Sequence, residues 1–163
     1  MGSFARSRGI VELDENYYCL TNTFDSSNSY QSFLLMKLDM FGEVVQQKLF
    51  HLPGHSLFPG DVGGTLKKTN DGNLIFAYHA DGNGMTYSSL VKFNKELDAL
   101  WKKDYTTENL KTMTMNCQII EDDGYILSGS VKPEDGSFWD FLLLKTDSLG
   151  NEQWHQSYGN EWH

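Results

Sequence analysis

An internal repeat is the feature that most constrains what this chain can fold into. Three segments align with one another: 33–43, 88–98 and 141–151. In this alignment Lys37, Lys92 and Lys145 coincide, at steps of 55 and 53 residues. A repeat of this kind predicts one supersecondary unit present three times, whose copies bury their apolar faces against each other.

Aromatic and turn residues follow the same repeat. Phe50, Tyr105 and Tyr158 fall at the same two steps, and Trp101 matches Trp154. Further upstream, one aligned position is occupied by residues that tolerate a positive φ: Asn16, Gly72 and Gly124. Such residues suit a tight hairpin turn, so we expect a hairpin at this position in every copy.

Each copy is predicted to contain four short strands, here named a to d. Strand a is expected at 9–13, 65–69 and 117–121, and strand b at about 17–23, 73–79 and 125–131. Strand c is expected at about 32–38, 87–93 and 140–146, and strand d at about 44–50, 99–105 and 152–158. The whole chain, 1–163, is then one repeat domain with units at about 9–50, 65–105 and 117–158. Only the 107–116 segment allows a short helical turn, since no stretch sustains a period near 3.6.

The strands c indicate how the units pack. Segments 33–36 and 141–144 are apolar at every position, whereas a sheet with one wet face would alternate. Sheets covered on both faces are typical of the blades of a β-propeller. We therefore expect an all-β, propeller-type array of three four-stranded antiparallel blades, with a β-sandwich as the rival fold. The core should include these residues: Phe33, Leu35, Leu90, Ile126, Leu143, Trp101 and Trp154.

The hairpin between strands c and d carries a family resemblance. The third copy reads D-x-x-G-x-x-x-W from Asp147 to Trp154, after an apolar strand and before Tyr158-Gly159. With the segment 123–130, this resembles blade repeats of large exported proteins of Bacteroidetes-type bacteria, and more distantly quinoprotein-like propellers. The second copy departs from the pattern at Leu97, and the first has Gln46 in place of the Trp. The resemblance implies an extracytoplasmic protein. It matches no quinone-binding residues, so no cofactor is expected.

Charge and composition exclude several classes of partner. The formal net charge is −9, which disfavours nucleic acid and anionic lipid as ligands. No apolar run reaches membrane-spanning length, and 1–9 lack the apolar core of a signal peptide, although a signal already removed stays open. Cys19 and Cys117 are expected to be free core thiols rather than a bridge.

The candidate site lies where the long connections gather. Strands alternate in direction, so the b–c loops (24–31, 80–86 and 132–139) and the d–a connections (51–64 and 106–116) share one end. Long loops on a rigid scaffold often carry binding residues, although connections between blades need length in any case. The ligand-binding candidates at this end are His51, His55, Asp61, His79, Asp81, Tyr87, Glu134, Asp135, Trp139 and Asp140. No catalytic residue and no metal site are assigned, and 81–84 is expected to be a turn rather than a calcium loop.

The sequence predicts function only at the level of class. No catalytic motif is present, so we expect a non-catalytic module for binding, adhesion or scaffolding, with a protein or carbohydrate ligand. Trp139 with its acidic neighbours would suit a sugar, or it could seal a blade interface. The alternative is a glycan-active hydrolase or lyase on the same scaffold. Three blades leave two apolar faces uncovered, so either further blades of a longer chain or self-association is expected.

Overall fold

The computed structural model describes residues 6–25, 30–60, 65–106, 110–133 and 138–159. Strands account for 72% of the described residues, and no helix occurs among them. The strands form three antiparallel sheets, which occur in chain order. The first sheet consists of β1 (Arg6–Leu13), β2 (Asn16–Asp25), β3 (Tyr30–Leu38) and β4 (Val44–Phe50). The all-β array of three antiparallel units predicted from the repeat is confirmed.

The second sheet has five strands because its strand a is divided. Its strands are β5 (His55–Pro59), β6 (Lys67–Lys68), β7 (Leu74–Gly82), β8 (Met85–Phe93) and β9 (Ala99–Tyr105). Both β5 and β6 pair with β7, at its two ends. The third sheet returns to four strands: β10 (Leu110–Ile119), β11 (Tyr125–Pro133), β12 (Asp140–Thr146) and β13 (Glu152–Tyr158).

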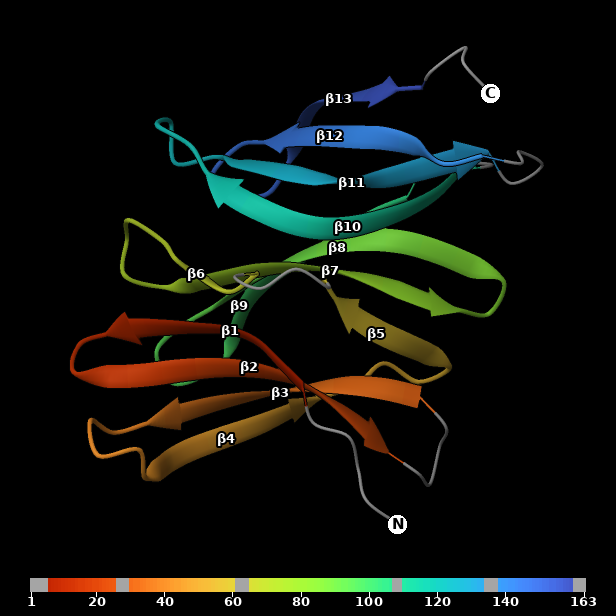
Figure 1. Ribbon diagram of the computed structural model, residues 1–163. Coiled ribbons are helices and arrows are strands. Elements are labelled where there is room, and N and C mark those ends of the chain that lie inside the picture. The colour runs from red at the N-terminus through yellow and green to blue at the C-terminus, as the bar shows by residue number, and fades with distance from the viewer. Residues whose placement is uncertain (1–5, 26–29, 61–64, 107–109, 134–137, 160–163) are drawn as a thin grey trace.

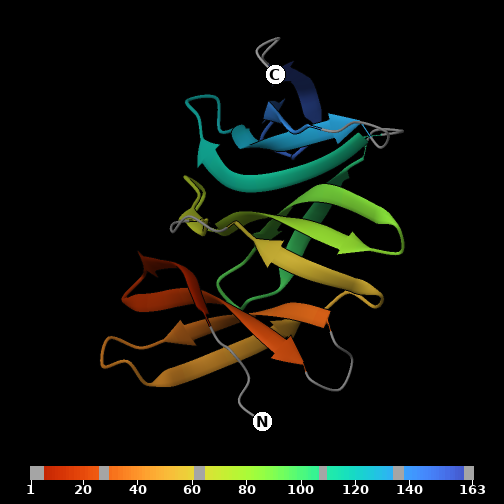
Figure 2. The ribbon, with the colours of Figure 1, turned by 45° about the vertical axis from the view of Figure 1, so that its right-hand side comes forward.

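The three sheets are stacked face to face along the chain (Figure 1), and the rotated view shows the same order (Figure 2). One apolar cluster joins the first and second sheets, and a second joins the second and third. The middle sheet is therefore covered on both faces, whereas the first and third sheets, whose strands c are the unbroken apolar ones, are each covered on one face by another sheet. We call the face that a sheet turns toward the next sheet in the chain its forward face, and the opposite one its back face.

The turns between strands c and d explain the D-x-x-G pattern. Asp39, Asn94 and Asp147 each accept two backbone N–H groups through one side-chain oxygen, at 2.8–3.0 Å. The third residue after each of them has a left-handed backbone: Gly42 (φ 85°), Leu97 (φ 60°) and Gly150 (φ 76°). Glycine is the residue that adopts this conformation without strain, so Leu97 is the exception.

The a–b turns differ from the predicted alignment by one residue. Gly72 does have a positive φ (75°), but in the third sheet Asp123 adopts it (φ 60°) and Gly124 does not. Gly124 is small for another reason, because a Cβ there would lie 2.4 Å from the carbonyl oxygen of Thr146. In the first sheet the two turn residues are Asp14 and Glu15, not Asn16.

One a–b turn also holds a strongly perturbed carboxyl group. Burial opposes ionisation of Asp71, but hydrogen bonds from Lys92, Thr69 and Asn73 outweigh it. Together they lower the pKa of Asp71 to about 2. The Lys92 ammonium lies 2.7 Å from the Asp71 carboxylate, and its side chain is 9% exposed. This pair fixes the turn to the forward face of the second sheet.

Three connections are shorter than the sequence suggests. Residues 55–59 of the predicted 51–64 connection form β5, because they pair with the end of β7. The predicted 80–86 loop is a two-residue turn at Asn83-Gly84, with Gly82 opposite Met85. The expectation that 81–84 is a turn is therefore correct for Asn83 and Gly84, whereas Asp81 and Gly82 belong to β7. In the predicted 106–116 connection, residues 110–116 belong to strand β10, so the expectation of a helical turn is wrong for that part.

The predicted core is correct where a second sheet covers it. Phe33, Leu35 and Leu90 are at most 2% exposed. Trp101 is half-buried. The expectation fails for Ile126 and Leu143, which are only half-buried, and for Trp154, which is 40% exposed. These three share the forward face of the third sheet, at one end of the stack.

Candidate functional site

A groove opens between the second and third sheets. It lies at the ends of the strands where strand b connects to strand c. Its volume is about 500 Å³, within the range of pockets that hold small ligands. Eight described residues line it: Phe58, His79, Asp81, Thr86, Lys111, Met113, Lys132 and Trp139. The second sheet supplies the first four and the third sheet the last four, so the groove exists only because the two sheets stack.

The hairpin β7–β8 positions the polar side chains of the second sheet. His79 and Asp81 are two apart on β7, so they project from the same face of the sheet. The Thr86 hydroxyl donates to a carboxylate oxygen of Asp81 at 2.9 Å. The ring of His79 stacks on Phe58 of β5, with centroids 4.9 Å apart and planes 14° apart. His79 also contacts the third sheet, since its Nδ1 lies 3.5 Å from the carbonyl oxygen of Thr114.

The third sheet contributes an aromatic ring and two ammonium groups. Trp139 is 41% exposed, and the Lys132 ammonium lies 5.4 Å from its ring centroid, a cation–π distance. Lys132 and Lys111 are directly opposite each other on β11 and β10. With Asp81 as the one carboxylate among the eight, the lining carries a net charge of about +1 when His79 is neutral. This local charge contrasts with the net charge of −9 on the chain.

The structure separates the sequence candidates into groups. Three of them, His79, Asp81 and Trp139, line the groove. Tyr87 is 9% exposed and packs in the cluster between the first and second sheets, so it faces away from the groove. His55 contacts Tyr87, with ring centroids 5.9 Å apart, and therefore belongs to the same side.

Two further described candidates lie outside the groove. His51 is exposed after β4, and Asp140 is half-buried at the start of β12. Asp61, Glu134 and Asp135 lie outside the described residues. In the part of the chain that the structure describes, no group of three or more His, Cys, Asp or Glu side chains is placed to hold a metal ion.

Sequence reasoning missed five of the lining residues, Phe58, Thr86, Lys111, Met113 and Lys132. Phe58 and Thr86 fall in predicted loops, whereas they lie on β5 and β8. Lys111 and Met113 fall in a predicted connection that is strand β10. A signal for Lys132 exists, because the predicted loop 132–139 begins with it, but its position beside Trp139 depends on the stacking of the strands.

A second hollow of about 360 Å³ lies between the first and second sheets and shares Phe58. Arg6, Arg8, Asn22 and Gln31 contribute to it, and the Arg8 side chain donates to Asn22 at 3.2 Å. Both inter-sheet junctions thus form a hollow, but only the larger one contains residues selected from the sequence.

No protein-family model matches the chain, and no curated protein matches it. In the described parts of the chain we find no apolar helix of membrane-spanning length.

Proposed function

We propose that the chain is a non-catalytic binding module of an exported bacterial protein, and that its groove holds a carbohydrate. The observation that carries this proposal is the half-exposed ring of Trp139, which lies beside Lys132 in a groove that also contains Asp81. An aromatic face packs against the apolar face of a sugar ring, and charged groups bond to its hydroxyls. The exported, bacterial setting rests on the resemblance of the D-x-x-G-x-x-x-W hairpins.

The charge of the groove narrows the ligand class. Lys111 and Lys132 outnumber Asp81, so an acidic saccharide, with a carboxylate or sulfate group, is favoured over a neutral one. Since both ammonium groups lie on adjacent strands of one rigid sheet, they can approach a single anionic group together. The groove is open, which suits a chain that extends beyond it.

A hydrolase is the weaker interpretation of the same groove. Glycoside cleavage generally uses two carboxyl groups, one as acid and one as base or nucleophile. Of the described residues that line the groove, Asp81 alone has a carboxyl group. The hydrogen bond from the Thr86 hydroxyl holds this carboxyl group in place. Binding without bond cleavage therefore accounts for the described side chains better.

The test is a glycan array that contains neutral, uronic-acid and sulfated oligosaccharides, followed by titration calorimetry on the best ligand. Trp139→Ala should weaken binding about tenfold or more, which corresponds to roughly 1.4 kcal/mol. The matched control is Phe138→Ala, the neighbouring aromatic residue, which is 64% exposed and does not line the groove. Retention of full affinity by Trp139→Ala, or equal losses in both variants, would refute the groove as the binding site.

A further inference from the structure

The three sheets present equivalent residues on their forward faces. Equivalence follows from the cross-strand pairs on strands c and d. Lys37, Lys92 and Lys145 are opposite Gln46, Trp101 and Trp154, respectively. Two positions earlier on strand c, Leu35, Leu90 and Leu143 are opposite Lys48, Lys103 and Gln156. The next pairs are Phe33–Phe50, Ser88–Tyr105 and Phe141–Tyr158.

The two internal interfaces follow different pairing patterns at the c–d turn. In the interface of the first and second sheets, Gln46 donates to the carbonyl oxygen of Glu96 at 2.8 Å, and Leu97 is fully buried. In the interface of the second and third sheets, Trp101 takes the place of Gln46, and Gly150 takes that of Leu97. A Cβ on Gly150 would lie 2.8 Å from the Trp101 ring, so this Trp requires a glycine.

Two tyrosines complete the second pattern. The Tyr105 hydroxyl donates to the carbonyl oxygen of Gly150 at 2.9 Å. Tyr125, on the back face of the third sheet, lies with its ring centroid 6.0 Å from that of Trp101. The second pattern thus joins a Trp and a Tyr on the forward face to a Gly and a Tyr on the back face.

The free faces at the two ends of the stack carry the two halves of this second pattern. The forward face of the third sheet has Trp154 and Tyr158, which are 40% and 55% exposed. The back face of the first sheet has Gly42, where a Cβ would meet nothing within 4 Å. It also has Tyr17, which pairs with Leu38 as Tyr125 pairs with Thr146. The second sheet has Leu74 at this position, opposite Phe93.

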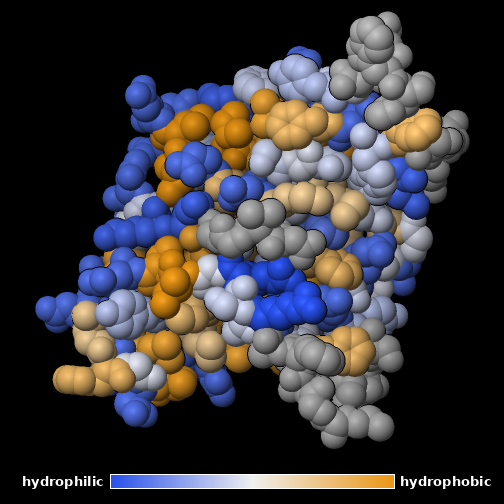
Figure 3. Space-filling model, in the orientation of Figure 1, coloured by the Kyte–Doolittle hydropathy of each residue, from blue (hydrophilic) through white to orange (hydrophobic). Residues whose placement is uncertain are grey.

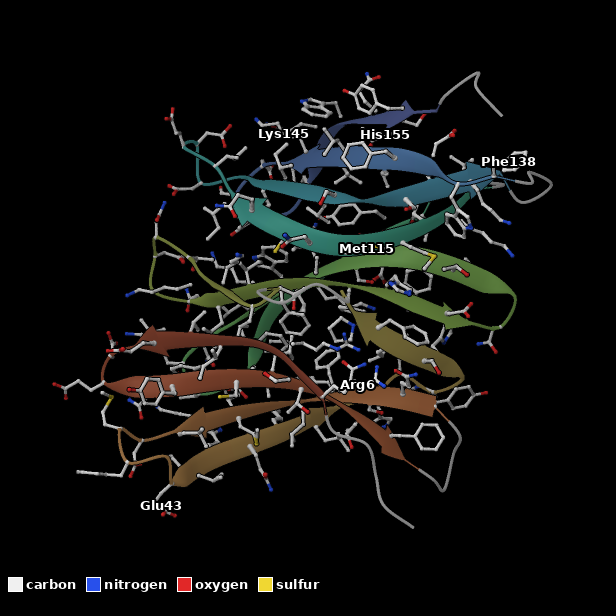
Figure 4. The ribbon with its side chains drawn as sticks, viewed as in Figure 1. Arg6, Glu43, Met115, Phe138, Lys145 and His155 are labelled. Carbon is white, nitrogen blue, oxygen red and sulfur yellow. The ribbon has the colours of Figure 1, made fainter. Side chains whose placement is uncertain are left out.

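Polar contacts at the interface edge extend the match. Lys48 bonds to Asp98 at 2.8 Å, and Lys103 bonds to Asn151 at 3.0 Å, each across one internal interface. The third members of these two series are Gln156 and Glu43, an amide that can donate and a carboxylate that can accept. Figure 4 shows Glu43 at one end of the stack and Lys145 at the other, so these two halves cannot meet within one chain.

The rest of both free faces is largely apolar. On the back face of the first sheet, Ile10, Val44 and Leu49 are 51–61% exposed. On the forward face of the third sheet, Phe141 is 49% exposed and contacts Tyr158. Figure 3 shows hydrophobic residues at the surface over β12 and near the β3–β4 turn. Apolar surface of this kind favours a partner over water.

We infer that a second copy of the chain docks on this one head to tail, with the back face of its first sheet on the forward face of the third sheet. Trp154 lies over Gly42 and Tyr17 of the second copy, and Tyr158 donates to the carbonyl oxygen of that Gly42. Two copies that use both of their ends form a closed ring of six sheets, which leaves no free face. This inference does not depend on the carbohydrate groove, so either one can fail without the other.

Light scattering on designed variants tests the pairing pattern. The native protein should have twice the monomer mass of 18.6 kDa. Gly42→Leu and Trp154→Gln should each weaken the dimer at least tenfold. The double variant should recover it, because Gln with Leu is the combination in the first internal interface. Met85→Ser, which removes an exposed apolar side chain (52%) at the β7–β8 turn, is the control and should remain dimeric.

Folding of the variants can be checked independently. Leu97 already occupies the equivalent turn position at φ 60°, so Gly42→Leu should keep the native far-UV circular dichroism spectrum. A native protein that is monomeric would overturn the inference. A double variant that stays dissociated would also overturn the inference, since the contact between the two copies would then not depend on the pairing of these two residues.

A mixing experiment tests the head-to-tail arrangement. Leu143→Asp disables the forward face of the third sheet, and Gly42→Leu disables the back face of the first. Each variant alone should be monomeric, and an equal mixture should form a heterodimer through the one intact pair of faces. If either variant alone dimerises, the contact joins like faces and the inference is wrong.

Discussion

The contact between Trp101 and Gly150 gives the sharpest prediction about what holds neighbouring sheets together. Gly150→Ala places a methyl group 2.8–3.0 Å from the Trp101 ring and the Lys103 side chain. Overpacking of this kind costs about 1–3 kcal/mol. The left-handed backbone at Gly150 (φ 76°) adds about 1–2 kcal/mol for any residue with a Cβ. The free energy of unfolding should therefore fall by about 2–5 kcal/mol.

Gly84→Ala is the matched control for this prediction. Gly84 has nearly the same φ (77°), but a Cβ at this position would meet nothing within 4 Å, so only the backbone cost of about 1–2 kcal/mol applies. Urea unfolding at one protein concentration measures the stability of both variants under the same contribution from any association. Equal losses of stability in the two variants would refute the view that Trp101 packs tightly on the turn of the third sheet.

Three individual side chains give further predictions. Because its lowered pKa stabilises the native state, Asp71 should contribute fully above pH 3.8 and lose that contribution as the pH falls toward about 2. The stability difference between the native protein and Asp71→Asn, from urea midpoints at pH 5 to 2, should therefore shrink with acidity; a constant difference would contradict this. Burial raises the pKa of Cys117 to about 12, so in the dissociated Gly42→Leu variant iodoacetamide should modify half-buried Cys19 first and Cys117 only on unfolding, as mass spectrometry can show. Tyr105→Phe should cost about 1–2 kcal/mol in urea unfolding, since it leaves the buried carbonyl of Gly150 without its donor, and an unchanged midpoint would exclude that bond.

The repeat in the sequence is enough to predict the fold because strand patterning and turn chemistry agree in every copy. Aligned positions such as Lys37, Lys92 and Lys145 do occupy equivalent places on strand c. The c–d turns also follow from local chemistry, since one Asp or Asn side chain organises each turn. Local signals of this kind survive in a single sequence, because they depend on residues only a few positions apart.

The errors come from places where tertiary contacts decide. The sequence predicts a connection without regular structure over 51–64, yet residues 55–59 form strand β5, because they pair with the end of β7. Gly124 aligns with residues expected to have a left-handed backbone. The close approach of the Thr146 carbonyl oxygen is instead the reason why a glycine stands at this position. Because Trp154 aligns with Trp101, the sequence predicts a core position for it. Trp154 is instead exposed, since it lies on the forward face of the third sheet, the last one in the stack.

The candidate site is predictable only in part, for the same reason. His79, Asp81 and Trp139 can be selected as polar or aromatic residues near strand ends. Their gathering in one groove depends on the stacking of the second sheet on the third. Tyr87 shows the limit of this reasoning, since it is close to Asp81 in sequence but belongs to the opposite face of its sheet.

Chemical crosslinking between the two ends of the stack tests the head-to-tail account most directly. In a Cys19→Ser background, one variant carries Glu43→Cys and the other carries Gln156→Cys. These two positions lie at opposite ends of the stack, so a short bis-maleimide can join the two thiols only between copies. We predict a covalent dimer from an equal mixture of the two variants, each of which has one introduced cysteine beside the buried Cys117, and none from either variant alone. Crosslinking within one variant alone, or none in the mixture, would contradict the proposed contact between the third sheet of one copy and the first sheet of the next.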